Sequence, residues 1–263
     1  MTVLLADLRA ALRSVRRAPR FSLIAVLTLA VGIGAVTTLT SVIDTLLLRP
    51  PAGVEAPGRV VRLFFNHHSP QFGDYRNSVV SFPDFTDLGP AASFTSLAAH
   101  YCSAASMGRG AEATSVSLAA VTGRYFSLLG TSPLLGRLLG PDDDRSDAGV
   151  PVAVLSERLW RTRFGADRGI LGRTIALDDQ SYAVVGVAPR AFDGGDYDAP
   201  DLWVPFTVVA HHMQGNDDYR TDRGWYFISL LARVAPAVSL ERATAEATGL
   251  IHAGRSDSTT ANG

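Results

Sequence analysis

One uninterrupted apolar run near the N-terminus constrains this chain more than any other feature. No charged side chain occurs from Phe21 through Ile43, and the run then continues past a single acid, Asp44, to Leu48. A helix needs about 20 apolar residues to cross a hydrocarbon core of about 30 Å. The run therefore predicts one transmembrane helix over residues 21–48, with Asp44 hydrated at the outer interface.

The residues before the run predict its orientation. Residues 1–20 contain five arginines and one acid, Asp7, and such an excess holds the preceding end in the cytoplasm. Apolar residues such as Leu4, Leu8 and Val15 share one helical face, which predicts a basic amphipathic helix on the inner membrane surface. A solvated extension of the anchor is the alternative. A cleaved signal peptide is disfavoured, because its apolar part spans only about 7 to 15 residues.

Small residues inside the run are candidates for helix packing. Ala30 and Gly34 stand four residues apart, a spacing that lets a second helix approach closely. The Gly-Ile-Gly sequence at this point is not a dinucleotide-binding loop, because no strand precedes it and the third glycine is missing. Ala30 and Gly34 are therefore candidates for packing against another helix.

Charge and cysteine content limit the partners and the disulfides that can be expected for the residues after the apolar run. The whole chain has a net charge of −1 although its first 20 residues are strongly basic, so the remainder is acidic and nucleic acid is not expected as a partner. Cys102 is the only cysteine. An exported domain with one thiol has no internal disulfide, and we expect that thiol to be buried and unreactive.

Beyond the run, short strands and helices alternate. Helix-start residues occur at Ser81 or Phe82, at Ser156 and at Ser239, and glycines at 130 and 165 end two of the helices. Apolar runs predict strands over 59–65, 96–107, 113–121, 151–155, 174–177, 182–187, 202–206 and 225–234. These elements predict an α+β extracytoplasmic domain of mixed sheets with helices, either in one lobe or in two lobes that meet near the loop from Asp142 to Val150.

The expected organisation has five parts. They are a basic amphipathic juxtamembrane helix (1–20), a transmembrane helix (21–48), a linker (49–58), the outer core domain (59–253) and a disordered tail or truncation point (254–263). The linker is expected from its Pro-Pro and Gly content. The tail is expected from its Ser, Thr, Ala and Gly content.

Residues that could carry chemistry form no convincing site. His67-His68 and His211-His212 are adjacent pairs whose side chains diverge on a strand or a helix, and no cysteine or carboxylate spacing supports a metal. The Asp142-Asp143-Asp144 and Asp217-Asp218 clusters lack a calcium-loop pattern, so solvated turns are the simpler interpretation. We expect no catalytic, cofactor-binding or metal-binding residue and no enzyme activity. Trp160 and Phe164, four residues apart on one helix, are expected to belong to the structural core.

Several ordered stretches carry a family resemblance. They are 8–13, 30–35, 47–50, 82–85, 123–126, 129–137, 154–165, 172–175 and 184–189. Together they resemble the MacB/FtsX-type ABC transporter permeases, specifically the first transmembrane helix and the MacB-like periplasmic core domain of the duplicated permeases that lack a fused ATPase.

The resemblance implies a permease subunit of an efflux transporter in the bacterial inner membrane. Its implied partners are membrane lipid, other permease helices or a second permease copy, a separate cytoplasmic ABC ATPase and a periplasmic adaptor. In that family three more spans follow the outer domain, whereas no such apolar run follows here, so we expect a permease fragment. The alternative is an anchored extracytoplasmic scaffold or adaptor module that binds a protein partner without transport.

Overall fold

The computed structural model describes residues 19–43, 53–69, 73–110, 113–145, 149–190, 192, 194, 199–214 and 217–261. The chain divides into two units, Met1–Pro50 and Pro51–Gly263, and each is described by itself. Most of the predicted surface helix over 1–20, and the part of the linker that precedes Gly53, lie outside the described residues.

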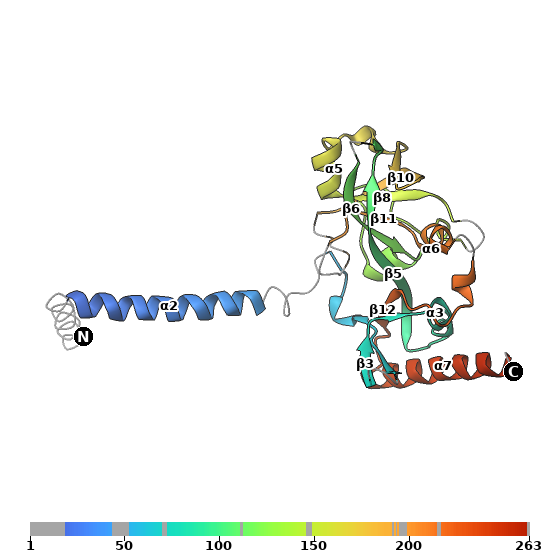
Figure 1. The fold of residues 1–263 in the computed structure, drawn as a ribbon, viewed down its shortest axis with the longest axis horizontal. Helices are drawn as coiled ribbons and strands as arrows, with labels where there is room; N and C mark the ends of the chain where they lie inside the picture. Colours follow the sequence, from blue (N-terminus) through green and yellow to red (C-terminus); the bar gives the residue numbers. More distant parts are fainter. Residues whose placement is uncertain are drawn as a thin grey trace. The chain divides into compact units, whose positions relative to one another are not determined.

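The described part of the first unit is one long helix, α2 (Pro19–Ile43, 25 residues; Figure 1). Its large apolar side chains are exposed, from 55% at Leu27 to 71% at Val31. The hydroxyls of Thr28, Thr37 and Thr38 donate to backbone carbonyls four residues earlier, at 2.8–2.9 Å, so these polar groups are satisfied within the helix. Over the residues that can be described, no helix is both long and apolar enough to cross a membrane.

The helix-packing candidates lie in the middle of α2. Ala30 and Gly34 are both exposed, and no atom outside the helix's own backbone comes within 4 Å of the position that a Cβ of Gly34 would occupy. Their role in packing against another helix stays a prediction.

The second unit is built on a mixed ten-stranded sheet. Its main path runs β1-β12-β5-β6-β11-β8-β10-β7, with β4 paired to β12 and β9 paired to both β10 and β5. The strands are β1 (Val60–Arg62), β4 (Val79–Val80), β5 (Phe94–Met107), β6 (Thr114–Val121), β7 (Leu135–Gly136), β8 (Val152–Ser156), β9 (Thr174–Leu177), β10 (Gln180–Ala188), β11 (Leu202–Pro205) and β12 (Ile228–Val234). The β11–β6 and β10–β8 pairs are parallel and the others antiparallel. A separate hairpin joins β2 (Phe65–Ser69) and β3 (Gly73–Asn77).

Side chains of alternate residues fill two cores, one on each face of the sheet. Along β8, Ala153 and Leu155 belong to the larger core, whereas Val152 and Val154 belong to the smaller one. This alternation follows from the two-residue period of a strand. The larger core also contains apolar residues of α5 (Glu157–Phe164), α6 (Phe206–Gln214) and α7 (Leu240–Ala261), and the smaller core contains those of α4 (Tyr125–Leu129).

Most of the predicted elements are confirmed. The predicted caps form at α3 (Phe82–Asp87), where Ser81 and Asp84 make a capping box, and at α5, where the Ser156 hydroxyl accepts from Leu159 N–H. Gly130 and Gly165 end α4 and α5 in the left-handed conformation. Helix α6 was not predicted, because its start overlaps the apolar residues assigned to the preceding strand.

The alternative of two lobes is wrong for the described part of the chain. The ten strands form one continuous sheet, and Pro51–Gly263 is one compact unit. Strand β5 explains the continuity, because its 14 residues pair with β12, β6 and β9. The two cores therefore lie on opposite faces of one sheet.

Residues 254–261 belong to the segment predicted as a disordered tail or truncation point, and they are helical, since α7 continues to Ala261. Arg255 anchors this segment, donating from Nη2 to Asp84 Oδ2 at 2.9 Å and from Nε to Oδ1 at 3.2 Å. Its guanidinium also lies 5.8 Å from the Tyr226 ring centroid. Composition alone missed these contacts with distant parts of the sequence.

Cys102 is exposed, contrary to the prediction. It lies in the middle of β5, opposite Ala119 of β6. Tyr101, its neighbour, packs on the larger core, so Cys102 points to the other face of the sheet.

Candidate functional site

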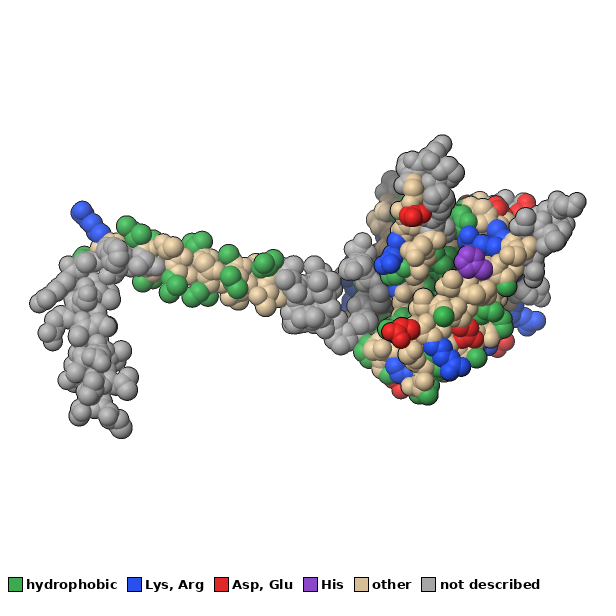
Figure 2. Space-filling view, turned by 90° about the horizontal axis from the view of Figure 1, so that it is seen from below, with side chains coloured by type: hydrophobic (Ala, Val, Ile, Leu, Met, Phe, Trp, Pro, Cys, Tyr) green, Lys and Arg blue, Asp and Glu red, His purple; other side chains and the backbone are tan. Residues whose placement is uncertain are grey.

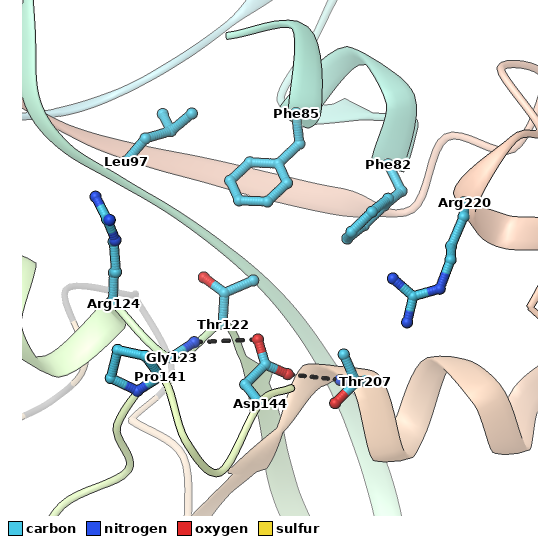
Figure 3. A pocket seen from close by; sticks show the side chains of 10 residues that line it. All are labelled: Phe82, Phe85, Leu97, Thr122, Gly123, Arg124, Pro141, Asp144, Thr207 and Arg220. Atoms are coloured by element: carbon cyan, nitrogen blue, oxygen red, sulfur yellow. Dashed lines mark hydrogen bonds between the residues drawn. The ribbon is translucent and has the colours of Figure 1, made fainter. Parts of the chain in front are cut away.

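A small cavity of about 270 Å³ opens among segments that are far apart in the sequence (Figure 3). Its walls come from α3, β5, the turn after β6, the loop after β7, the start of α6 and the 3₁₀ helix η5 (Asp218–Arg220). The lining residues are Phe82, Phe85, Leu97, Thr122, Gly123, Arg124, Pro141, Asp144, Thr207 and Arg220. We call it the α3–α6 cavity.

One wall of the α3–α6 cavity is aromatic. Phe82 and Phe85 project from α3, with ring centroids 5.6 Å apart, and Phe82 also stacks on Phe206 at 5.6 Å with an interplanar angle of 7°. Tyr219 meets Phe82 edge to face at 5.1 Å. Aromatic pairs of this kind hold each other in fixed orientations, so this wall is preformed.

Asp144 forms the opposite, polar wall. Its carboxylate accepts hydrogen bonds from Thr207 N–H at 2.8 Å and from Gly123 N–H at 3.1 Å (Figure 3). Burial raises the pKa of Asp144, and the hydrogen bonds from Thr207 and Gly123 offset this rise in part. Because Thr207 lies in the first turn of α6, Asp144 caps that helix from a distant loop.

Two arginines border the cavity. The Arg220 guanidinium lies 4.8 Å from the Tyr219 ring centroid and 5.7 Å from that of Phe82, and its side chain is 26% exposed. Arg124 is exposed at the N-terminal end of α4. The cavity therefore offers an aromatic surface beside two cations, which suits recognition of an apolar group with an adjacent hydrogen-bond acceptor.

The acidic cluster beside the cavity is not the solvated turn that the sequence predicted. Asp143 is 5% exposed and accepts from both terminal nitrogens of Arg137, at 2.6 and 2.8 Å, and from Gly140 N–H at 2.9 Å. Burial would raise the pKa of Asp143, but these hydrogen bonds and the Arg137 charge together lower it. Asp142 alone of the three stays exposed.

The histidine pairs do not converge in the described residues. His211 Nδ1 lies 3.2 Å from Asp217 Oδ1, whereas His212 Nε2 lies 2.8 Å from Asp179 Oδ1. The side chains of His67 and His68 lie outside the described set. No group of three or more potential metal-ligating side chains occurs where side chains are described.

Trp160 and Phe164 lie on α5, away from the α3–α6 cavity. Trp160 is 7% exposed in the larger core, where its indole N–H donates to the Asp167 carbonyl at 2.8 Å. Phe164 is partly buried against the same core. Of the cavity residues, sequence reasoning singled out the Phe82–Phe85 helix start, Asp144 and the 123–126 stretch, but gave no signal that joined them.

Together, the mixed α+β sheet of the described outer unit and the small α3–α6 cavity define the class of domain to which the chain belongs. Comparison with known families narrows this class. The model of the MacB-like periplasmic core domain matches residues 22–250, and the chain belongs to this family, whose members occur in ABC transporter permeases.

Relatives and solved structures agree with this family. The macrolide export ATP-binding/permease protein MacB of Burkholderia thailandensis is 34% identical over 93 residues, which is 35% of this chain and 14% of that protein. MacB of Neisseria gonorrhoeae is 32% identical over 100 residues, 38% of this chain and 15% of that protein. These matches therefore span about one seventh of the relatives' length.

Two solved structures share the fold. The periplasmic region of MacB from Actinobacillus actinomycetemcomitans has a TM-score of 0.57 at 20% identity, covering 76% of this chain and 85% of that one. The extracellular domain of the ABC-type transporter YknZ from Gram-positive bacteria has a TM-score of 0.56 at 16% identity, covering 75% and 95%. The outer unit is thus a mixed α+β domain like the MacB periplasmic region.

Proposed function

We propose that this chain is part of the permease subunit of an ABC-type efflux transporter, which couples to a separate cytoplasmic ATPase and is not itself an enzyme. The observation that carries the proposal is the family match over residues 22–250, because it includes most of α2 as well as the outer domain. The curated relatives are named as macrolide exporters. Efflux by this chain is inferred from that similarity.

We further propose that the apolar run over residues 21–48, which includes most of α2, anchors the chain in the bacterial inner membrane, with the N-terminus cytoplasmic. The uncharged run from Phe21 to Ile43, its preceding arginines and the exposure of the apolar side chains of α2 support this placement. A phosphatase active only outside the cytoplasm, fused after Gly263, should be active. Stable but inactive fusions would contradict the orientation.

A charge test addresses the anchor directly. Leu27→Arg with Val31→Arg places two cations near the middle of the run, at a cost of about 2.5–3.5 kcal/mol each. We expect the double variant to leave the alkali-resistant membrane fraction. Leu240→Arg, at an apolar residue that is 62% exposed outside α2, is the matched control and should stay membrane-bound. Equal retention of both variants would contradict the anchor.

Photocrosslinking separates the transporter from the scaffold alternative. A photoreactive residue at Leu12 should capture a protein with ATP-binding motifs if the chain is a permease part. A second one at Phe85, in the α3–α6 cavity, should capture a periplasmic adaptor if this cavity is its contact. Capture at Phe85 with none at Leu12 would instead favour the anchored scaffold that binds a partner without transport.

A further inference from the structure

A second cavity, of about 510 Å³, lies between α7 and the edge of the sheet. Strand β1 ends the main path of the sheet, and its Val61 and the following Leu63 and Phe65 form one wall. Helix α7 forms the other wall with Thr244 and Thr248. We call it the α7 cavity. Figure 2 views the molecule from the side on which α7 lies, and apolar side chains are visible there between charged ones.

The α7 cavity exists because α7 presents small side chains to the sheet edge. Ala243, Ala247 and Ile251, spaced by one turn, are buried along the helix, but the two alanines do not fill the space that remains. Protein interiors are otherwise close-packed, and ligand cavities are typically about 300–1,000 Å³. A cavity of this size is therefore suited to a ligand.

The lining of the α7 cavity is mainly apolar. Two large apolar side chains at its border are strongly exposed, Phe64 at 57% and Leu240 at 62%. Exposed apolar groups beside an apolar cavity extend the surface that a ligand could cover. An elongated apolar chain fits this arrangement better than a compact polar molecule.

The polar groups of the α7 cavity include hydrogen-bond donors near the C-terminal end of α7. His252 and Arg255 lie there, three residues apart, and Arg255 remains 37% exposed although it pairs with Asp84. No carboxylate is found among the described residues that line the cavity. A ligand head that accepts hydrogen bonds, such as a carboxylate or an ester, is complementary to this end.

We propose that the α7 cavity binds the acyl chain of a lipid-like amphipath, with the accepting head group at the His252–Arg255 end. The chain would lie between α7 and the β1 edge and cover Phe64 and Leu240. Binding of this kind is independent of ATPase coupling, so it can be measured without ATP and can succeed or fail separately from the proposed efflux role.

The test uses the full chain in phosphatidylcholine nanodiscs with a diazirine-bearing palmitic acid as the probe. After illumination, mass spectrometry should find the label on peptides from residues 60–66 and 240–255, and unlabelled palmitate should compete. The matching diazirine alcohol should label these peptides about threefold less, because it lacks the carboxylate. Label confined to residues 21–43 would mean partition into the bilayer only and would overturn the site.

Two neighbouring substitutions provide the matched control. Thr244→Trp fills the α7 cavity from an exposed position and should reduce labelling at least fivefold, whereas Ala245→Trp, exposed on the same helix and outside the lining, should not. If Thr244→Trp shifts the unfolding midpoint, Thr248→Trp replaces it. Equal labelling of the cavity and control variants, or a crosslink between two copies of the chain in place of the probe, would refute the proposal.

Discussion

Replacing Asp84 tests the ion cluster that joins α3 to two distant segments. The Asp84 carboxylate is fully buried and pairs with Arg223 at 3.2 Å and with Arg255 at 2.9 Å. Its oxygen also accepts from Ser81 N–H at 3.4 Å within the capping box. Asp84→Ala leaves both arginines without this partner, although Arg223 keeps Asp87 at 2.7 Å.

The expected loss follows from burial. Removing one partner of a buried ion pair costs about 3–5 kcal/mol, and the arginine side chains are 24% and 37% exposed, so water partly compensates. We therefore expect a loss of about 3 kcal/mol in the free energy of unfolding. For a domain of this size that corresponds to a fall in Tm of roughly 6–12 °C.

Urea unfolding of the full chain in detergent, followed by tryptophan fluorescence, measures this loss. Asp142→Ala removes an exposed carboxylate and should stay within about 0.5 kcal/mol of the unsubstituted chain. Asp87→Ala, which loses only the Arg223 contact, should fall between the two. If Asp84→Ala were no more destabilising than Asp142→Ala, the cluster would not hold α7 against α3.

Two further substitutions test the loop after β7 and the β10 strand. Asp143→Asn should lower the free energy of unfolding by about 1 kcal/mol at pH 7. The pKa of Asp143 is lowered in the folded state, so the ionised carboxylate stabilises the fold fully above the unfolded pKa of about 3.9. This stabilisation is lost as the pH falls through the folded pKa. Urea unfolding should show that the unsubstituted chain and Asp143→Asn differ less in free energy of unfolding at pH 3 than at pH 7. A difference that is the same at both pH values would contradict the pairing of Asp143 with Arg137. Gly186→Ala places a methyl group against the Arg137 backbone carbonyl and should lower stability by about 1–3 kcal/mol. Gly58→Ala is the control, because no atom lies within 4 Å of the new Cβ, and it should change the thermal midpoint little. If Gly186→Ala and Gly58→Ala changed the midpoint equally, the close approach of Gly186 to the Arg137 carbonyl would be refuted.

Local chemistry explains why many elements could be predicted from the sequence. Ser156 and Gly165 delimit α5 through contacts within a few residues. Val152 to Leu155 form a continuous apolar run because both faces of β8 are buried. Local information gave a wrong prediction at Phe206. This apolar residue continues the pattern of the preceding strand, but it begins α6. There the Thr207 N–H is capped by Asp144, 63 residues away, and nothing near Phe206 signals it.

The acidic run at 142–144 shows where prediction of a site from sequence stops. Three consecutive aspartates have the same chemistry in isolation, yet Asp142 is exposed, Asp143 pairs with Arg137, and Asp144 caps α6. Their pKa values even move in opposite directions, lowered at Asp143 and raised at Asp144, because one gains a cation while burial dominates at the other. What distinguishes them is the Arg137 guanidinium, six residues away, at Asp143 and the backbone N–H groups of more distant residues at Asp144. The α3–α6 cavity, whose walls come from segments as far apart as Phe82 and Arg220, is therefore a property of the folded sheet and of no single stretch of the chain.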